Sequence, residues 1–93
     1  MAFADEQSYE EMISALQTFV SQTEEQCSVM ESAGKDCVDN TDGDPAATKA
    51  DSKLQKCVGD IRATCETING IISALQEELE EIRAAAAKAN FDE

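Results

Sequence analysis

The chain has 93 residues with 20 acidic and 7 basic side chains, which gives a formal net charge of −13 at pH 7. This length corresponds to one domain with a thin core. The acidic balance excludes nucleic acid as a partner and disfavours an anionic membrane surface, because phosphate groups would be repelled.

The composition is typical of long helices. Aromatic residues make up 4% of the chain, and Gly and Pro number only 4 and 1. We therefore predict an all-α protein. No run approaches the roughly 18 apolar residues of a membrane span, so we expect no membrane insertion. Residues 1–6 contain neither a basic region nor an apolar core, so we expect no signal peptide and a chain that is cytoplasmic or exported by another route.

The first predicted helix covers about residues 8–40. Ser8 and Glu11 fit a capping box, in which a hydroxyl and a carboxylate each bind a free backbone N–H at the helix start. Apolar residues then recur at helical spacing on one face: Tyr9, Met12, Ile13, Leu16, Phe19 and Val20. The pattern fades at Asn40, where we expect the helix to end.

Residues 41–45 carry the strongest turn signal in the chain. Gly43 can adopt a positive φ at little cost, so the motif Thr41-Asp42-Gly43 is expected to end the first helix. Asp44 followed by Pro45 is typical of an N-cap and a first helical residue. We therefore place the second helix from about residue 46 onward.

The second predicted helix covers about residues 46–90 and carries the most regular pattern in the sequence. Every seventh position is apolar: Ala47, Leu54, Ile61, Ile68, Leu75, Ile82 and Ala89. A neighbouring column has the same spacing: Val58, Cys65, Ile72, Leu79 and Ala86. At ~1.5 Å rise per residue, this helix would be roughly 60 Å long and could not bury its own stripe.

Two long helices joined by one short turn form an antiparallel hairpin. A lone hairpin would leave apolar surface open on both helices. We therefore predict that two hairpins pair into a four-helix bundle, as a homodimer or with a different helical protein. The residues expected at that interface are Leu16, Phe19, Leu54, Ile61, Ile68, Ile72, Leu75 and Leu79.

Four cysteines lie two on each predicted helix. Facing residues of an antiparallel hairpin have nearly constant number sums, so Cys27 would face Cys65, and Cys37 would face Cys57. Either these pairs form two disulfides across the hairpin, or all four are free thiols that act as small apolar core residues. A metal site is not expected, because the spacings are too wide and the chain has no His.

The sequence lacks the groups that most enzymes use. It has no His and no glycine-rich phosphate loop, and its acid pairs fall on helix faces expected to be solvated. A calcium-binding loop with Gly43 at its sixth position would need acidic ligands at its first and last positions. The sequence has Val38 and Lys49 there, so a calcium loop is excluded. We therefore predict a non-enzymatic protein with no cofactor and no metal ion.

In length and layout the chain resembles the small Trp-x-Gly (WXG) secreted proteins of type VII secretion. That family has a Trp-x-Gly tripeptide at the turn between two helices. Here the aligned residues are Thr41-Asp42-Gly43, with the Gly kept and the Trp replaced. The family's export signal places an aromatic residue and an acid after an Ala-rich stretch. The matching tail here is Phe91-Asp92-Glu93, with Phe in place of the usual Tyr.

This resemblance implies a chain that is exported from the cytoplasm to the cell surface or the medium. It equally implies a targeting partner of a larger toxin with a helical LXG-type N-terminal domain. Two other interpretations stay open. The cysteine pattern is similar to the twin-cysteine hairpins of the mitochondrial intermembrane space, although the gap from Cys57 to Cys65 is shorter than theirs. The other open interpretation is that the chain is a generic coiled-coil adaptor.

Overall fold

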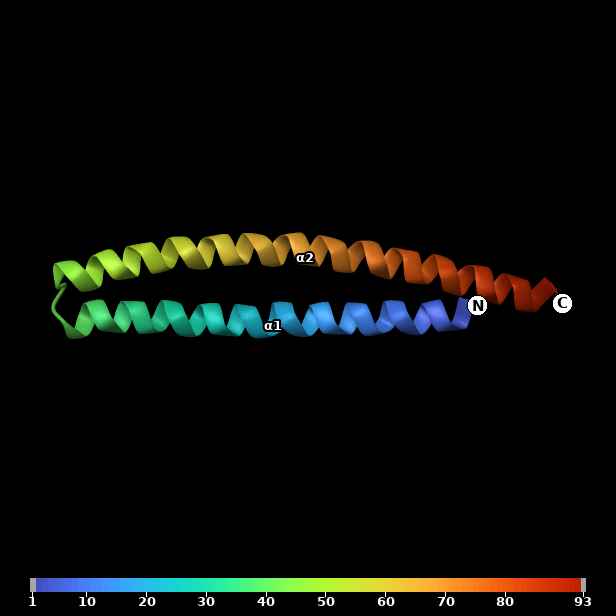
Figure 1. The fold of residues 1–93 in the computed structure, drawn as a ribbon, viewed down its shortest axis with the longest axis horizontal. Helices are drawn as coiled ribbons and strands as arrows, with labels where there is room; N and C mark the ends of the chain where they lie inside the picture. The colour runs from blue at the N-terminus through green and yellow to red at the C-terminus, as the bar shows by residue number, and fades with distance from the viewer. Residues whose placement is uncertain (1, 93) are drawn as a thin grey trace.

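The protein is a single antiparallel pair of long helices (Figure 1). The computed structural model describes the backbone of residues 2–92 and the side chains of residues 6–89. Helix α1 covers Ala2–Asn40 and helix α2 covers Pro45–Asp92. The two helices lie side by side in a rod of 73 × 15 × 15 Å, with the turn at one end. The prediction of an all-α helical hairpin is confirmed.

Helix α1 begins earlier than the sequence pattern predicted. Ser8 lies inside the helix rather than at its N-cap, so the predicted capping box with Glu11 is wrong. Instead, Gln7 Nε2 donates a hydrogen bond of 3.1 Å to Glu11 Oε1, one turn further on. The sequence has no Gly or Pro before Gly34, so nothing stops the helix from extending toward its N-terminus.

The end of α1 is closed by a pair of hydrogen bonds that wrap the chain back onto the helix. Gly43 N donates to Val38 O at 2.9 Å, and Asp42 N donates to Asp39 O at 3.3 Å. This 6→1 and 5→2 pattern defines a Schellman motif. Gly43 has a φ of 75°, as predicted, but Asp42 also adopts a positive φ of 54°. The motif therefore places an acidic residue where helices usually have Gly.

This geometry makes opposite predictions for two adjacent substitutions. We expect Asp42→Gly to raise the free energy of unfolding by about 0.5–1 kcal/mol, because Gly adopts the left-handed region without strain. Gly43→Ala should lower it by about 1 kcal/mol or more, since its φ disfavours any side chain. Urea titration followed by circular dichroism measures both. Equal effects of the same sign would contradict the assigned turn.

The start of α2 agrees with the predicted N-cap. Asp44 Oδ2 accepts hydrogen bonds from the backbone N–H groups of Ala46 at 3.1 Å and Ala47 at 3.2 Å. Thr48 N donates the first helical bond to Asp44 O at 2.9 Å. Pro45 is the first helical residue, where its missing N–H costs nothing. The carboxylate of Asp44 therefore satisfies donors that the helix leaves free.

The core between the helices is one column of residues from each helix, which we call the central column. It comprises Ile13, Val20, Cys27 and Gly34 of α1 with Val58, Cys65, Ile72 and Leu79 of α2. Members of a helix are seven residues apart, or two turns, so they share one side. Ile13 of α1, for example, packs in one buried cluster with both Ile72 and Leu79 of α2. Six of the eight are at most 7% exposed, so this column seals α1 against α2.

Near the turn, the helices come close together at Gly34. A Cβ atom at this position would lie 2.3 Å from Asp51 Oδ1 and 3.1 Å from Leu54 Cδ2. Gly59 and Gly70 in α2 have open space where a Cβ would be. The close helix contact is therefore made by the glycine of α1 and not by either glycine of α2.

Candidate functional site

The central column divides the hairpin into two long faces of opposite chemistry. The polar face comprises Glu10, Gln17, Glu24 and Glu31 of α1 with Gln55, Arg62, Asn69, Gln76 and Arg83 of α2. The apolar face comprises Tyr9, Leu16, Thr23 and Met30 of α1 with Ala47, Leu54, Ile61, Ile68, Leu75 and Ile82 of α2. Each set again repeats every seven residues, so each forms a strip along its helix.

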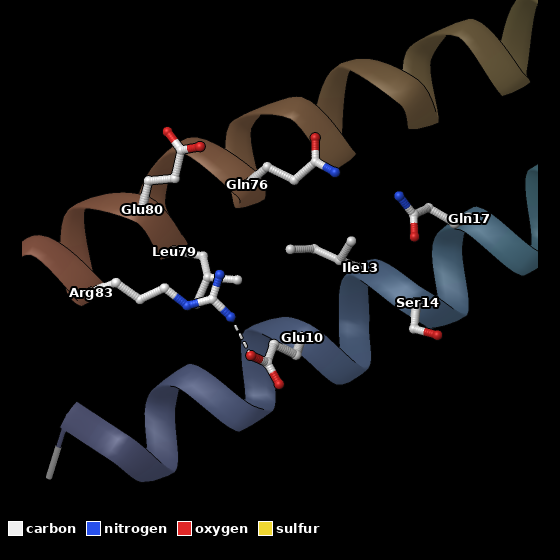
Figure 2. A pocket seen from close by; sticks show the side chains of 8 residues that line it. All are labelled: Glu10, Ile13, Ser14, Gln17, Gln76, Leu79, Glu80 and Arg83. Atoms are coloured by element: carbon white, nitrogen blue, oxygen red, sulfur yellow. Dashed lines mark hydrogen bonds and ion pairs between the residues drawn. The ribbon is translucent and has the colours of Figure 1, made fainter.

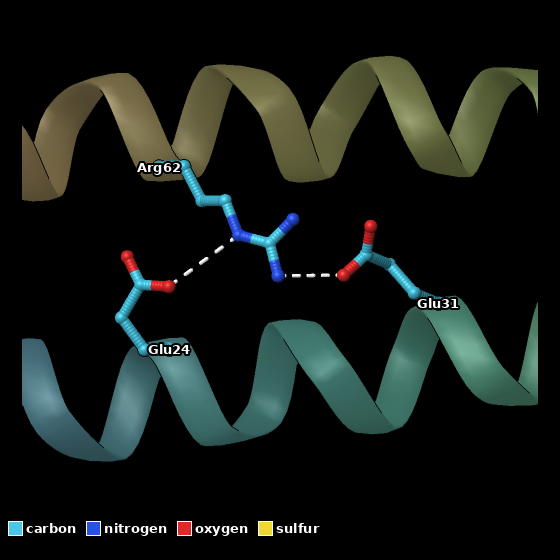
Figure 3. A network of polar contacts seen from close by, with 3 residues as sticks. All are labelled: Glu24, Glu31 and Arg62. Carbon is cyan, nitrogen blue, oxygen red and sulfur yellow. Dashed lines mark hydrogen bonds and ion pairs between the residues drawn. The ribbon is translucent and has the colours of Figure 1, made fainter.

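Two arginines of α2 connect the helices across the polar face. Arg62 Nη2 donates to Glu31 Oε1 at 2.6 Å, and its Nε donates to Glu24 Oε2 at 3.4 Å (Figure 3). Arg83 Nε donates to Glu6 Oε1 at 2.5 Å, and its Nη2 pairs with Glu10 (Figure 2). These side chains are 23–51% exposed. Exposed ion pairs contribute little to stability, so we assign them mainly to fixing the alignment of the helices.

The Glu31–Arg62 pair predicts a specific pH dependence. The hydrogen bond from Arg62 lowers the pKa of the Glu31 carboxyl below its ordinary value. The wild type should therefore be more stable than Glu31→Gln above the ordinary glutamate pKa. That advantage should disappear as the pH falls through the lowered pKa and the carboxylate is protonated.

Melting temperatures of both proteins, measured in steps from about pH 7 down to about pH 2, follow the loss of this advantage. The matched control is Glu25→Gln. Glu25 is an exposed glutamate of the same helix and takes no part in the ion pairs of Arg62 and Arg83. An equal difference between wild type and Glu31→Gln throughout this pH range would contradict the pairing.

A groove of about 500 Å³ lies on the polar face near the open end of the hairpin (Figure 2). Its lining residues are Glu10, Ile13, Ser14, Gln17, Gln76, Leu79, Glu80 and Arg83. Arg83, the one cation of this lining, is already paired with Glu10 and Glu6. The groove therefore combines a floor of two core side chains with walls of solvated acids and amides, and its arginine charge is balanced within the chain.

The apolar face differs from the polar face in both exposure and charge. Its leucine and isoleucine side chains are half-buried by the neighbouring helix. Large apolar side chains at its margins remain far more open, with Met12 51%, Phe19 50% and Ile71 44% exposed. A two-helix hairpin has no third element to cover these residues. This face and its margins therefore form a long apolar surface of the described chain that water solvates poorly.

Two shallow depressions shape the apolar face. One has a volume of about 210 Å³ and is lined by Ser8, Tyr9, Met12 and Leu75. The other has a volume of about 370 Å³ and is lined by Phe19, Gln22, Thr23, Gln26, Met30 and Ile61. All ten lining residues are uncharged. Depressions of this size between ridges suit the side chains of another helix.

The structure separates the eight predicted interface residues into two groups. Leu16, Leu54, Ile61, Ile68 and Leu75 belong to the apolar face, and Phe19 lies at its margin. Ile72 and Leu79 are each 6% exposed and lie in the central column. These two therefore pack α1 against α2, and their placement at an outer interface is corrected. Met12 and Ile71, which were not among the eight predicted residues, also lie at the margins of this face and are 51% and 44% exposed.

The four cysteines are thiols that fall into two kinds of environment. Cys27 and Cys65 are buried in the central column, whereas Cys37 and Cys57 are exposed. Cys57 precedes the buried Val58 by one residue, so its side chain is rotated by roughly 100° away from α1. Of the two predicted pairs, Cys27 and Cys65 thus share the buried core, whereas Cys37 and Cys57 both lie in contact with solvent.

The turn and tail motifs have different outcomes. Thr41 lies in the Schellman turn, where its Oγ1 donates to Cys37 O at 2.7 Å. Thus Thr41-Asp42-Gly43 is the helix–helix turn, as predicted. In the predicted tail, Phe91 and Asp92 continue α2. Their side chains and the whole of Glu93 lie outside the described residues.

Metal ligands, membrane-spanning helices and similarity to known proteins are three further indicators of function. Within residues 2–92, no three His, Cys, Asp or Glu side chains are grouped so as to hold a metal ion. Neither helix, over the same residues, is long and apolar enough to cross a membrane. No protein-family model matches the chain, and comparison with curated proteins and with solved structures finds no significant match. The apolar face is therefore the candidate functional site on physical grounds alone.

Proposed function

We propose that this chain is a non-enzymatic helical interaction protein that packs its apolar face against a second pair of helices. The observation that carries this proposal is the uncovered, uncharged strip that follows both helices. Burial of such side chains favours association by about 25 cal/mol per Å² of apolar area, before the entropic cost of association is subtracted. The paired helices belong to a second copy when the protein is pure, and to a larger helical partner where one is present.

The total surface of the chain supports this proposal. Its accessible area is 6725 Å², whereas a compact monomer of 10.0 kDa is expected to expose about 5,200 Å². The hairpin thus exposes roughly 1,500 Å² more than a compact protein of its mass. Covering one face with another hairpin would remove an area of this order from each copy.

The dimensions of the face are also sufficient for a stable complex. A flat rectangle with the two larger dimensions of the rod, 73 and 15 Å, has an area of about 1,100 Å². A standard protein interface buries about 800 Å² on each partner. The polar face, with its excess of acids, would stay in water on the outside of a four-helix bundle and keep the assembly soluble.

The resemblance to WXG proteins supplies the biological setting of the proposal. We assign the chain a role in type VII secretion, either as an exported substrate or as a targeting partner of a larger substrate such as an LXG-type toxin. The hairpin layout, Gly43 at the turn and the acidic tail support this role. The exposure of Cys37 and Cys57, both free thiols, favours it over a twin-cysteine hairpin with two disulfides.

An export assay tests the secretion role separately from the assembly. The tagged chain and a variant that lacks Phe91-Asp92-Glu93 would be expressed in a bacterium with an active type VII system. We expect the full chain in the culture medium and the variant retained in the cell, with equal helicity and equal oligomeric mass. Equal export of the two, or retention of both when tested with and without a co-expressed LXG-type substrate, would overturn the secretion role.

A further inference from the structure

Cys27 and Cys65 occupy the centre of the contact between the two helices. Each is 1% exposed, so with Val58 they are the most completely buried side chains described. Along the central column they are followed by Gly34 and Val58 on the side of the turn and by Val20 and Ile72 on the side of the open end. Both thiols are therefore shielded from water, and they are near enough for the charge of Cys27 to act on Cys65.

The burial of both cysteines places them on the sides of α1 and α2 that face each other, as an interhelical disulfide requires. In an antiparallel pair, facing central positions direct their Cβ atoms toward each other. A disulfide needs Cα atoms within about 7 Å and Cβ atoms about 4 Å apart. Two small side chains in one layer allow the helices to approach to the short end of the usual range of 8–10 Å. Gly34 in the next layer keeps the helices close on the side of the turn.

The folded hairpin also controls the reactivity of the pair. Burial raises the pKa of the Cys65 thiol, and the neighbouring charges of Glu24 and of Cys27 raise it further. Since the thiolate is the reactive form, these thiols react slowly while the hairpin is closed. They become accessible when the helices separate, as during folding or passage through a narrow channel. Oxidation is therefore expected as the hairpin closes rather than after it has closed.

We propose that Cys27 and Cys65 form an interhelical disulfide when the chain folds in an oxidising environment, and that this bond locks the two helices in register. The oxidant is a low-molecular-weight disulfide such as oxidised glutathione. One cysteine thiolate attacks it and releases one reduced thiol. The second cysteine then attacks the mixed disulfide and releases the other. In total the protein loses two electrons and two protons, one S–S bond forms, and the S–S bond of the oxidant is broken.

The expected consequence is a more stable hairpin with an unchanged apolar face. The bond closes a loop of 39 residues, counted from 27 to 65 inclusive. A loop of this size should raise the melting temperature by roughly 10–20 °C for a chain of this length. The two cysteines are in the central column, so the bond leaves the outer surface free for a partner. The proposal does not depend on the secretion role, because oxidation is tested on the pure chain.

The test uses two variants that isolate the two cysteine pairs. Cys37→Ser/Cys57→Ser keeps the buried pair, and Cys27→Ala/Cys65→Ala keeps the exposed pair. Each is refolded from urea with oxidised and reduced glutathione and is analysed by non-reducing peptide mass mapping. We expect the first variant to give a disulfide within each chain and none between chains, and a melting temperature that dithiothreitol lowers again. The second should give only free thiols or mixed disulfides with glutathione.

Two results would overturn the proposal. One is two free thiols at Cys27 and Cys65 after the first variant has refolded with oxidised glutathione. The other is a disulfide between them that lowers the melting temperature or reduces the helical content. Circular dichroism of the reduced first variant confirms that it folds, and this keeps the test valid even if the alanine variant does not fold.

Discussion

The double variant Phe19→Asp/Ile71→Asp is expected to abolish self-association while the hairpin itself stays folded. Both side chains are about half exposed at the margins of the apolar face. Each precedes a residue of the facing central pair Val20 and Ile72, so they lie at the same level of the rod. An unpaired carboxylate buried against a partner costs several kcal/mol. The dissociation constant should rise at least about a hundredfold.

A matched control adds the same charge on the other side of each helix. Thr18 and Ser73 are exposed neighbours of the altered region, and Thr18→Asp/Ser73→Asp also adds two acids. We expect this control to keep the wild-type mass in light scattering, and both double variants to keep wild-type helicity. If the control dissociates as readily as Phe19→Asp/Ile71→Asp, net charge and not the apolar face governs association.

The largest loss of stability within one hairpin is expected for Ile72→Ala. Ile72 is 6% exposed and belongs to the buried cluster with Ile13 and Leu79. Removal of three carbon atoms from a packed core costs about 2–4 kcal/mol. For a chain of this size that corresponds to a fall in melting temperature of roughly 10–20 °C. Thermal unfolding at a protein concentration low enough to keep the chain monomeric measures the stability of the single hairpin alone.

The adjacent Ile71 provides a control of identical chemistry. It is 44% exposed, and Ala is a better helix former, so Ile71→Ala should change the unfolding of the monomer by less than about 0.5 kcal/mol. Its effect should appear instead as weaker association at high concentration. The two substitutions thus separate the hairpin core from the outer interface. Equal loss of monomer stability in both would show that the assignment of inner and outer faces is wrong.

Most of the fold could be predicted from the sequence because the signals are local. Helix-forming residues predict where the two helices lie. The pair Asp44-Pro45, which contains the single Pro of the chain, predicts where α2 begins. The positive φ of Gly43 follows from residue type alone. The left-handed conformation of Asp42 does not, because it depends on the hydrogen bonds that close the Schellman turn. The start of α1 does not follow from the capping signal at Ser8, because helix-forming residues continue before it without Gly or Pro.

The candidate site could be predicted only in part, because periodicity identifies a stripe without orienting it. The most regular column, which includes Leu54, Ile61 and Leu75, forms the half-buried apolar face. The neighbouring column, with Val58 and Ile72, provides the buried contact with α1. Both columns are apolar, and a rotation of about 50° about the axis of α2 would exchange their roles. The choice between them depends on which column the α1 helix and the turn place opposite, which is tertiary information.

We propose that helices of another molecule cover the apolar face. Light scattering during size-exclusion chromatography of the pure, reduced protein at about 100 μM, well above the dissociation constant expected for an interface of standard size, tests it most directly. We predict a mass twice that of the 10.0 kDa chain, with the helical content unchanged on dilution. A mass of one chain at this concentration, in a protein that is fully helical and stays soluble, would contradict the account.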